Sequence, residues 1–227
     1  MDYYFVTYGL TLIAFVITTI AQLFVTTTYK KYSNVRNERN MTGAEAAREL
    51  LDKNNLHDVK VVEVSGYLTD HYDPRNKEVR LSSNNYRGTS ISSVSVACHE
   101  CGHAIQDKVG YIFLRIRASL VPVVNFSSYA GYISIVLGML FSSINLIWLG
   151  IILEMVILLF QIITLPVEID ASKRALKELD YSHFFNSEEL KKGRSVLVAA
   201  ALTYVASVAG ALLQILRLIL LFGRRDD

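Results

Sequence analysis

The chain has 227 residues, 52% of them hydrophobic, and its 23 basic and 21 acidic side chains leave a net charge of +2. This length suits one domain of ordinary size together with membrane spans. A nearly balanced charge offers no bulk attraction for a phosphate backbone, so we expect no nucleic-acid partner. Two cysteines are too few for a disulfide framework of the kind found in small secreted domains.

The first predicted element is an uncharged, mostly apolar run from Phe5 to Val25. It has about the 20 residues that a transmembrane helix needs. A secretory signal peptide is the alternative, but Asp2 and no Lys or Arg precede the run, and no small-residue cleavage site follows it. We therefore expect a retained transmembrane anchor over residues 1–28.

Residues 29–118 combine helix and strand patterns. Thr42 and Glu45 have the spacing of a capping box and predict the start of an amphipathic helix. Short strand-like runs at 59–64 and 78–81, separated by turn residues, predict a small β-sheet. A longer helix follows, which Ser90 or a close neighbour is expected to cap and which should run to about Asp107.

This longer helix contains HECGH at residues 99–103, a match to the pattern HExxH. His99 and His103 are four residues apart and lie on one helix face, so both imidazoles can reach one metal ion. Glu100 lies beside them and can take a proton from a metal-activated water without binding the metal itself. The pattern is typical of zinc hydrolases, although other divalent ions would also suit such ligands.

Three defined positions are a weak signal, and a helix that merely holds two histidines is the alternative. Small and apolar neighbours favour the catalytic interpretation, as does Gly102, which we expect on the metal side, leaving room for a ligand or substrate. Cys98 and Cys101 could be mistaken for a metal-binding pair. Because Cys101 falls roughly opposite the histidines, we interpret both cysteines as small buried hydrophobic residues.

Two apolar runs, Leu120 to Phe141 and Ile144 to Leu165, flank the short turn Ser142-Ser143 and predict a transmembrane hairpin over residues 119–165. Glu154 in the second run should face protein or water, because a charge that faces lipid is costly. A final apolar run predicts a C-terminal transmembrane helix and tail over residues 196–227.

A catalytic zinc ion needs a third protein ligand, and the candidate is Glu168. Pro166 can occupy the first turn of a new helix, on which Ala171 and Ser172 would share the face of Glu168. These small residues would allow a close approach to the HECGH helix. Alternatively, Glu168 only complements the positive N-terminus of its own helix, and the residues alone leave both interpretations open. We expect residues 166–195 to form this third-ligand helix and a connecting segment.

Taken together, these segments resemble the YugP-type bacterial neutral zinc metallopeptidases, which are membrane proteins with an HExGHA(I/L)Q helix and a later PVExDAS segment. Here the two motifs are HECGHAIQ at 99–106 and PVEIDAS at 166–172. Further matches are MTGAEAA at 41–47, LTDHYDP at 68–74 and AAALTYVA at 199–206. The resemblance thus covers nearly the whole chain, and the order of segments is also similar to that of the HtpX-type membrane proteases.

The resemblance implies a mainly α-helical membrane protein, with about four transmembrane helices and a zincin-like α+β catalytic part that holds a small β-sheet. It implies Zn²⁺ bound by His99, His103 and Glu168, with Glu100 as the general base. Cys101 departs from the family pattern, which has a small or apolar residue there. A residue that stabilises the oxyanion is also expected. The candidates are His71, Tyr86 and His183.

We therefore expect a membrane-anchored zinc endopeptidase with a polypeptide substrate. A site-2-type intramembrane protease is one alternative, but polar residues such as Ser92 and Lys108 flank the motif, so its helix does not look like a membrane span. A non-enzymatic zinc-stabilised membrane adaptor is another, and Glu100 argues against it because structural zinc needs no base. An oligomer or a membrane partner protein stays open. The strand at Lys77 to Ser82 is a candidate edge strand for pairing with substrate, with an ordinary hairpin strand as the alternative.

The distribution of basic residues predicts the orientation in the cell membrane. Residues 27–118 hold 14 Lys or Arg and residues 166–199 hold six, whereas the Ser142-Ser143 turn holds none. The positive-inside rule places both charged segments, and so the catalytic part, in the cytoplasm. Arg217, Arg224 and Arg225 oppose this assignment, because four full spans would place the C-terminus outside.

Overall fold

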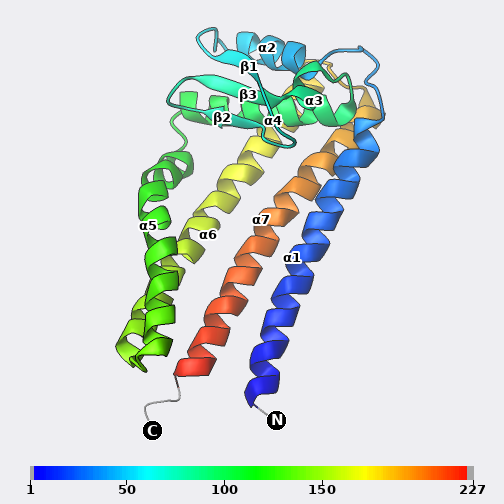
Figure 1. Ribbon diagram of the computed structural model, residues 1–227. Helices are drawn as coiled ribbons and strands as arrows, with labels where there is room; N and C mark the ends of the chain where they lie inside the picture. The colour runs from blue at the N-terminus through cyan, green and yellow to red at the C-terminus, as the bar shows by residue number, and fades with distance from the viewer. Residues whose placement is uncertain (1–2, 224–227) are drawn as a thin grey trace. The chain divides into compact units, whose positions relative to one another are not determined.

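The computed structural model describes residues 3–223, which form seven helices and, between the second and third helices, three short strands (Figure 1). Arg224 and Arg225, which bear on the predicted orientation, lie outside this range. The elements are α1 (Tyr3–Ser33), α2 (Gly43–Lys53), β1 (Lys60–Val64), β2 (His71–Asp73), β3 (Glu78–Ser82), α3 (Ser83–Arg87), α4 (Ile91–Lys108), α5 (Ile112–Leu140), α6 (Ile144–Tyr181) and α7 (Ser187–Phe222).

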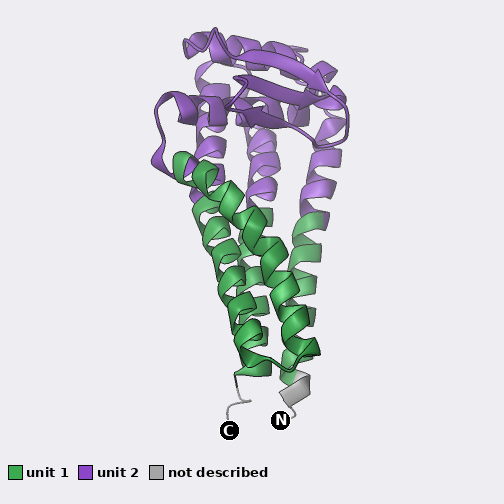
Figure 2. Ribbon diagram, turned by 60° about the vertical axis from the view of Figure 1, so that its left-hand side comes forward, with its two compact units in different colours: residues 1–22, 115–165, 203–227 green, residues 23–114, 166–202 purple. Residues whose placement is uncertain are grey.

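The chain divides into two compact units, coloured separately in Figure 2. Unit 1 consists of residues 1–22, 115–165 and 203–227, and unit 2 consists of residues 23–114 and 166–202. The HECGH motif on α4 and the segment that begins at Pro166 on α6 both belong to unit 2.

Unit 1 is built from the apolar parts of four long helices. α1, α5, α6 and α7 are each long and apolar enough to cross a membrane, which confirms the predicted mainly α-helical membrane protein with four candidate spans. α5 and α6 form a helical hairpin about Ser142, whose φ is 53°. A Cβ on Gly150 would lie 2.9 Å from the carbonyl oxygen of Gly131, so these glycines allow the two helices to pack closely.

The sheet of unit 2 has the strand order β1-β3-β2. β1 is parallel to β3, whereas β2 is antiparallel to it. The prediction that Lys77 to Ser82 forms an edge strand was therefore wrong, because β3 has a partner on each side. The sequence did not indicate β2 as a strand, since it has only three residues and its extended form depends on pairing with β3.

The hydrophobic core of unit 2 lies where α2 packs against α4 and both helices contact the sheet (Figure 1). The capping box of α2 is confirmed, with Thr42 and Glu45 bonded reciprocally. Ser90 is the N-cap of α4 and accepts a hydrogen bond from the backbone of Ser93, as predicted. The fully buried side chains of this core include Leu50, Leu51, Val79, Leu81, Ala97, Cys98, Cys101 and Ala104.

α6 continues without interruption through Pro166, so the prediction of a new helix starting at this proline was wrong. Proline removes one helical hydrogen bond but does not by itself end a long helix whose other turns are intact. The predicted face is nevertheless present, since Glu168, Ala171, Ser172 and Ala175 are all buried. The long apolar segment and Glu168 thus belong to one continuous helix.

Candidate metal centre

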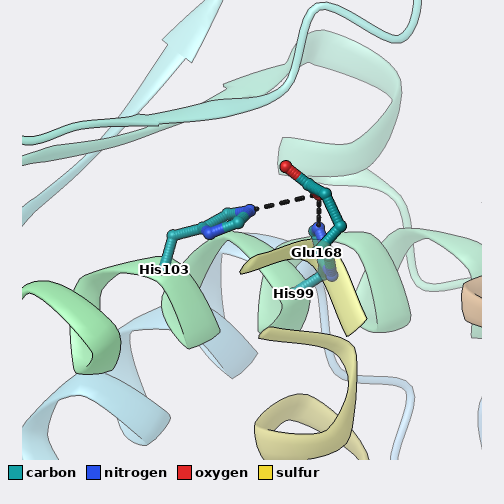
Figure 3. A group of neighbouring side chains, drawn as sticks. All are labelled: His99, His103 and Glu168. Atoms are coloured by element: carbon teal, nitrogen blue, oxygen red, sulfur yellow. Dashed lines mark hydrogen bonds and ion pairs between the residues drawn. The ribbon is translucent and has the colours of Figure 1, made fainter. Parts of the chain in front are cut away.

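Helices α4 and α6 bring together, within unit 2, three side chains that could hold a metal ion (Figure 3). Oε2 of Glu168 lies 3.3 Å from Nε2 of His99 and 3.5 Å from Nε2 of His103. One ligand atom from each residue lies within 4.8 Å of the others. Glu168 and His103 are buried, and the His99 side chain is 13% exposed, so the cluster is shielded but not sealed from solvent.

The donor set fits a zinc ion. Zinc prefers imidazole nitrogen and carboxylate oxygen at about 2.0–2.2 Å in a tetrahedral arrangement, which places neighbouring ligand atoms about 3.4 Å apart. The two nitrogen–oxygen distances already have this size. Two histidines and one glutamate would leave the fourth position of the ion for water or substrate, as in catalytic zinc sites.

Neighbouring side chains hold the remaining ring nitrogens of both histidines. Oγ of Ser172 lies 3.2 Å from Nδ1 of His99, and Oε1 of Gln106 lies 3.0 Å from Nδ1 of His103. Both rings therefore direct Nε2 toward Glu168. Our sequence reasoning did not identify these two supporting residues. The available signal was their helical spacing, since Gln106 follows His103 by three residues and Ser172 follows Glu168 by four.

Glu100 is on α4 next to His99 and is 8% exposed, but it is not part of the three-residue group. Burial raises the pKa of its carboxyl group, and the charges of His99 and His103 oppose this increase only in part. A carboxyl group with a raised pKa is suited to exchanging protons near neutral pH. For His103, burial lowers the pKa, but the hydrogen bond and charge of Glu168 outweigh it and raise the pKa overall.

Gly102 allows α4 and α6 to approach closely enough to form the group. A Cβ at this position would lie 2.5 Å from the carbonyl oxygen of Ala171 on α6. Gly102 thus faces the backbone of a neighbouring helix, and the expectation that it leaves room for a ligand or substrate was wrong. Its lack of a side chain determines the distance between the two ligand-bearing helices instead.

The other residues singled out in the sequence lie outside the group. His71 is exposed, with Nδ1 2.8 Å from the carbonyl oxygen of Thr69. Tyr86 packs partly buried against the hydrophobic core, and His183 is exposed just after the C-terminus of α6 with a φ of 52°. Among the residues that the structure describes, no contact assigns an oxyanion-stabilising role to any of the three, and this role stays a prediction.

The two cysteines are free and buried, which agrees with their interpretation as small hydrophobic residues. Sγ of Cys101 lies 3.6 Å from the backbone oxygen of Ala47 on α2, on the side of α4 that faces the core. Neither cysteine is part of the metal-binding group.

Comparisons with known proteins agree with this geometry. Residues 7–223 match the model of a family described as "Putative neutral zinc metallopeptidase". The chain is also 47% identical over 208 residues to a protein of Bacillus subtilis (strain 168) named "Putative membrane protease YugP", and the match covers 91% of this chain and 92% of that protein. No solved structure matches the chain. Since the family model and this relative both extend over most of its length, the chain belongs to the neutral zinc metallopeptidase family of YugP type, whose cofactor is Zn²⁺.

Proposed function

We propose that this protein is a membrane-anchored zinc endopeptidase whose metal is held by His99, His103 and Glu168 and whose general base is Glu100. The observation that carries the proposal is the meeting of three ligands from two distant segments, with a buried carboxyl group beside them on α4. A site that only stabilised the fold would not need an additional buried acid at this position.

In this mechanism bound zinc would polarise the substrate carbonyl and lower the pKa of a water molecule. Glu100 takes a proton from that water as its oxygen adds to the carbonyl carbon of the peptide. The same carboxyl group then delivers the proton to the peptide nitrogen as the carbon–nitrogen bond breaks. Ser172 and Gln106 keep the histidine rings oriented through both steps.

We further propose that catalysis occurs outside the lipid core, on the cytoplasmic side. The four described helices that could cross a membrane do not include α4, which speaks against an intramembrane protease of the site-2 type. The basic residues that flank the apolar segments support the cytoplasmic side. The substrate would then be a polypeptide segment that reaches the site from water or from the membrane surface.

The experiment that tests this function compares wild-type protein with Glu100→Gln, both purified in nanodiscs. Each is assayed for bound zinc and for cleavage of an unfolded polypeptide such as casein. We expect the wild type to bind one zinc ion per chain, to lose activity with a chelator and to regain it with zinc. Glu100→Gln should retain zinc and lose about 10²–10⁴-fold in turnover, because the metal remains but proton transfer fails.

Two results would overturn the proposal. Unchanged turnover in Glu100→Gln would show that Glu100 is not the base. Loss of zinc from this variant would show that Glu100 is a metal ligand. As a matched control, exposed Glu188 at the start of α7 can be changed to Gln, which should alter neither zinc content nor turnover.

A further inference from the structure

Gln106 makes three polar contacts beside the candidate metal centre. Its side chain is fully buried on α4. Oε1 lies 3.0 Å from Nδ1 of His103, and Nε2 donates hydrogen bonds of 2.8 Å to the backbone oxygen of Val167 and to Oδ2 of Asp170. One amide group therefore links a candidate zinc ligand on α4 to two consecutive turns of α6.

The partners of this amide determine its orientation. Both contacts on α6, the Val167 carbonyl and the Asp170 carboxylate, are acceptors, so the NH₂ group of Gln106 must point toward them. The amide oxygen is then directed at His103, where it can only accept. This bond requires the proton of His103 to be on Nδ1, which leaves the lone pair of Nε2 free for a metal.

A second contact fixes the acceptor on α6. Oδ2 of Asp170 also accepts a 2.6 Å hydrogen bond from Nε of Arg174, one turn later on α6. The guanidinium group holds the Asp170 carboxylate in place, where Oδ2 accepts from both Arg174 and Gln106. Each bond of this series thus has a defined donor: His103 donates to Gln106, and Gln106 and Arg174 both donate to Asp170.

The contact at the other histidine differs in kind. The Ser172 hydroxyl beside His99 can donate or accept and can rotate, so it does not select a tautomer. Ser172 is also on the same helix as Glu168, one turn away. Gln106 instead joins α4 to α6, and its Val167 contact lies directly beside Glu168 in the chain.

We propose that Gln106 is a positioning residue that sets the tautomer of His103 and, through Asp170, holds the two ligand-bearing helices in register for zinc. This inference rests on the proposed zinc site. This positioning role requires an amide side chain of the length of glutamine at position 106. Glutamate would place a second carboxylate against Asp170 and could not donate to Val167. Alanine would remove the bonds to Val167 and Asp170 and leave the buried Nδ1 of His103 without its acceptor.

The test measures zinc affinity by competition with a fluorescent chelator, using the full chain in nanodiscs. Gln106→Glu should bind zinc about 10–100-fold more weakly, the usual effect of losing such a supporting contact. Asp170→Asn should weaken zinc binding less than Gln106→Glu does, because the oxygen of the new amide can still accept from Gln106, although the ion pair with Arg174 is lost. In the double variant, the amide introduced at position 170 can donate to a carboxylate at position 106, which again accepts from His103. We therefore expect the double variant to recover at least threefold in affinity relative to Gln106→Glu.

Recovery of zinc affinity in the double variant would distinguish a directional hydrogen bond from simple packing. If the side chain at position 106 only filled space, exchanging donor and acceptor between positions 106 and 170 would not restore affinity. Gln106→Met, which keeps the volume and lacks both polar groups, covers the case in which Gln106→Glu does not fold. A thermal midpoint of the metal-free variant close to that of the wild type would show that the fold is kept. Its zinc affinity should fall about as much as that expected for Gln106→Glu. The matched control is Ser95→Ala, a fully buried residue of α4 whose hydroxyl has no partner and whose loss should leave zinc affinity unchanged.

The outcomes distinguish this inference from the proposed function. Wild-type zinc affinity in both Gln106→Glu and Gln106→Met would overturn the role of Gln106 while leaving the zinc peptidase intact. A double variant as weak as or weaker than Gln106→Glu would overturn the coupling through Asp170. A wild-type protein that binds no zinc would overturn the inference together with the function on which it rests.

Discussion

Each histidine of the HECGH motif has one ring nitrogen that could bind a metal ion and one that contacts a neighbouring side chain. The Nε2 atoms face Glu168, and the Nδ1 atoms face Ser172 and Gln106. A histidine held at both nitrogens loses little further side-chain entropy when a metal binds, which favours affinity. At the scale of single residues, the geometry of the site thus depends on Ser172 and Gln106, which orient the histidine rings, as well as on the three candidate ligands.

Glu168 provides the sharpest residue-scale prediction. Glu168→Ala should lower zinc affinity by at least about 100-fold and turnover with it, because two imidazoles hold zinc weakly with too many open positions. Bound metal per chain and casein cleavage are measured on the same sample. Asp180→Ala, at an exposed position later on α6, is the matched control and should change neither quantity. Full zinc occupancy and turnover in Glu168→Ala would move the third ligand elsewhere, with His71 and His183 tested next.

The two cysteines allow a prediction from their pKa values. Burial raises the pKa of both Cys98 and Cys101, so each stays a protonated thiol at neutral pH, and a raised pKa means that thiolate appears only under more alkaline conditions. We expect iodoacetamide at pH 8 to leave both unmodified in the folded protein and to modify both after denaturation, as measured by intact mass. Cysteine introduced at exposed Ser83 should react under native conditions. Rapid native labelling of Cys98 would contradict the buried packing.

At the scale of elements, the site depends on how closely α4 and α6 approach. Gly102 on α4 faces the backbone of Ala171, and Gln106 one turn later bonds to the backbone of Val167. The caps of α2 and α4 were predictable because Thr42, Glu45 and Ser90 act on backbone within their own turn. β2 was not predictable, since its pairing with β3 is a contact between segments.

Gly102→Ala should separate these two helices. The added Cβ would lie 2.5 Å from the Ala171 carbonyl oxygen, and relieving the clash should lower the free energy of unfolding by about 1–3 kcal/mol. Zinc affinity should fall as well, because Glu168 moves away from the histidines. Thermal unfolding and zinc competition measure the two effects. Gly9→Ala on α1, where a Cβ meets nothing within 4 Å, is the control and should be neutral or slightly stabilising. Unchanged zinc affinity in Gly102→Ala would show that the site tolerates a wider separation.

At the scale of the whole molecule, a hairpin that crosses the membrane would explain why candidate ligands from distant segments can meet. His103 and Glu168 are separated in sequence by α5 and the apolar part of α6. If each of these helices crosses the membrane once, the chain returns to the side from which it left. Both halves of the metal site then face the same compartment, which a single zinc ion requires.

The predicted orientation can be tested by labelling single cysteines in intact cells. We expect a membrane-impermeant maleimide to modify Ser142→Cys in the α5–α6 turn, because this turn should face the outside. Ser83→Cys in unit 2 should react only after the cells are permeabilised. Cys98 and Cys101 are buried and need not be removed for this experiment. The reverse labelling pattern would place the catalytic part outside and refute the assignment from basic residues.

The sequence by itself determined the features that depend on local pattern or composition. These are the four apolar runs, the helix caps, the shared face of His99 and His103, and the resemblance to the metallopeptidase family. Hydrophobic length and helical period are properties of neighbouring residues, so they can be recognised without knowing the fold. Glu168 became a candidate ligand because a catalytic zinc ion needs three protein ligands and because the chain resembles the metallopeptidase family. The sequence around Glu168 did not by itself decide between a zinc ligand and a residue that complements the N-terminus of its helix.

Only the tertiary structure decided which segments touch. It placed β3 in the centre of the sheet, continued α6 through Pro166, and brought the backbone of Ala171 against Gly102. It also revealed Gln106 as the link between His103 and Asp170. The contacts between α4 and α6 join residues more than 60 positions apart, and their formation depends on the packing of unit 2. No local pattern contains that information, because the same glutamine or glycine could face solvent, lipid or core in a different packing.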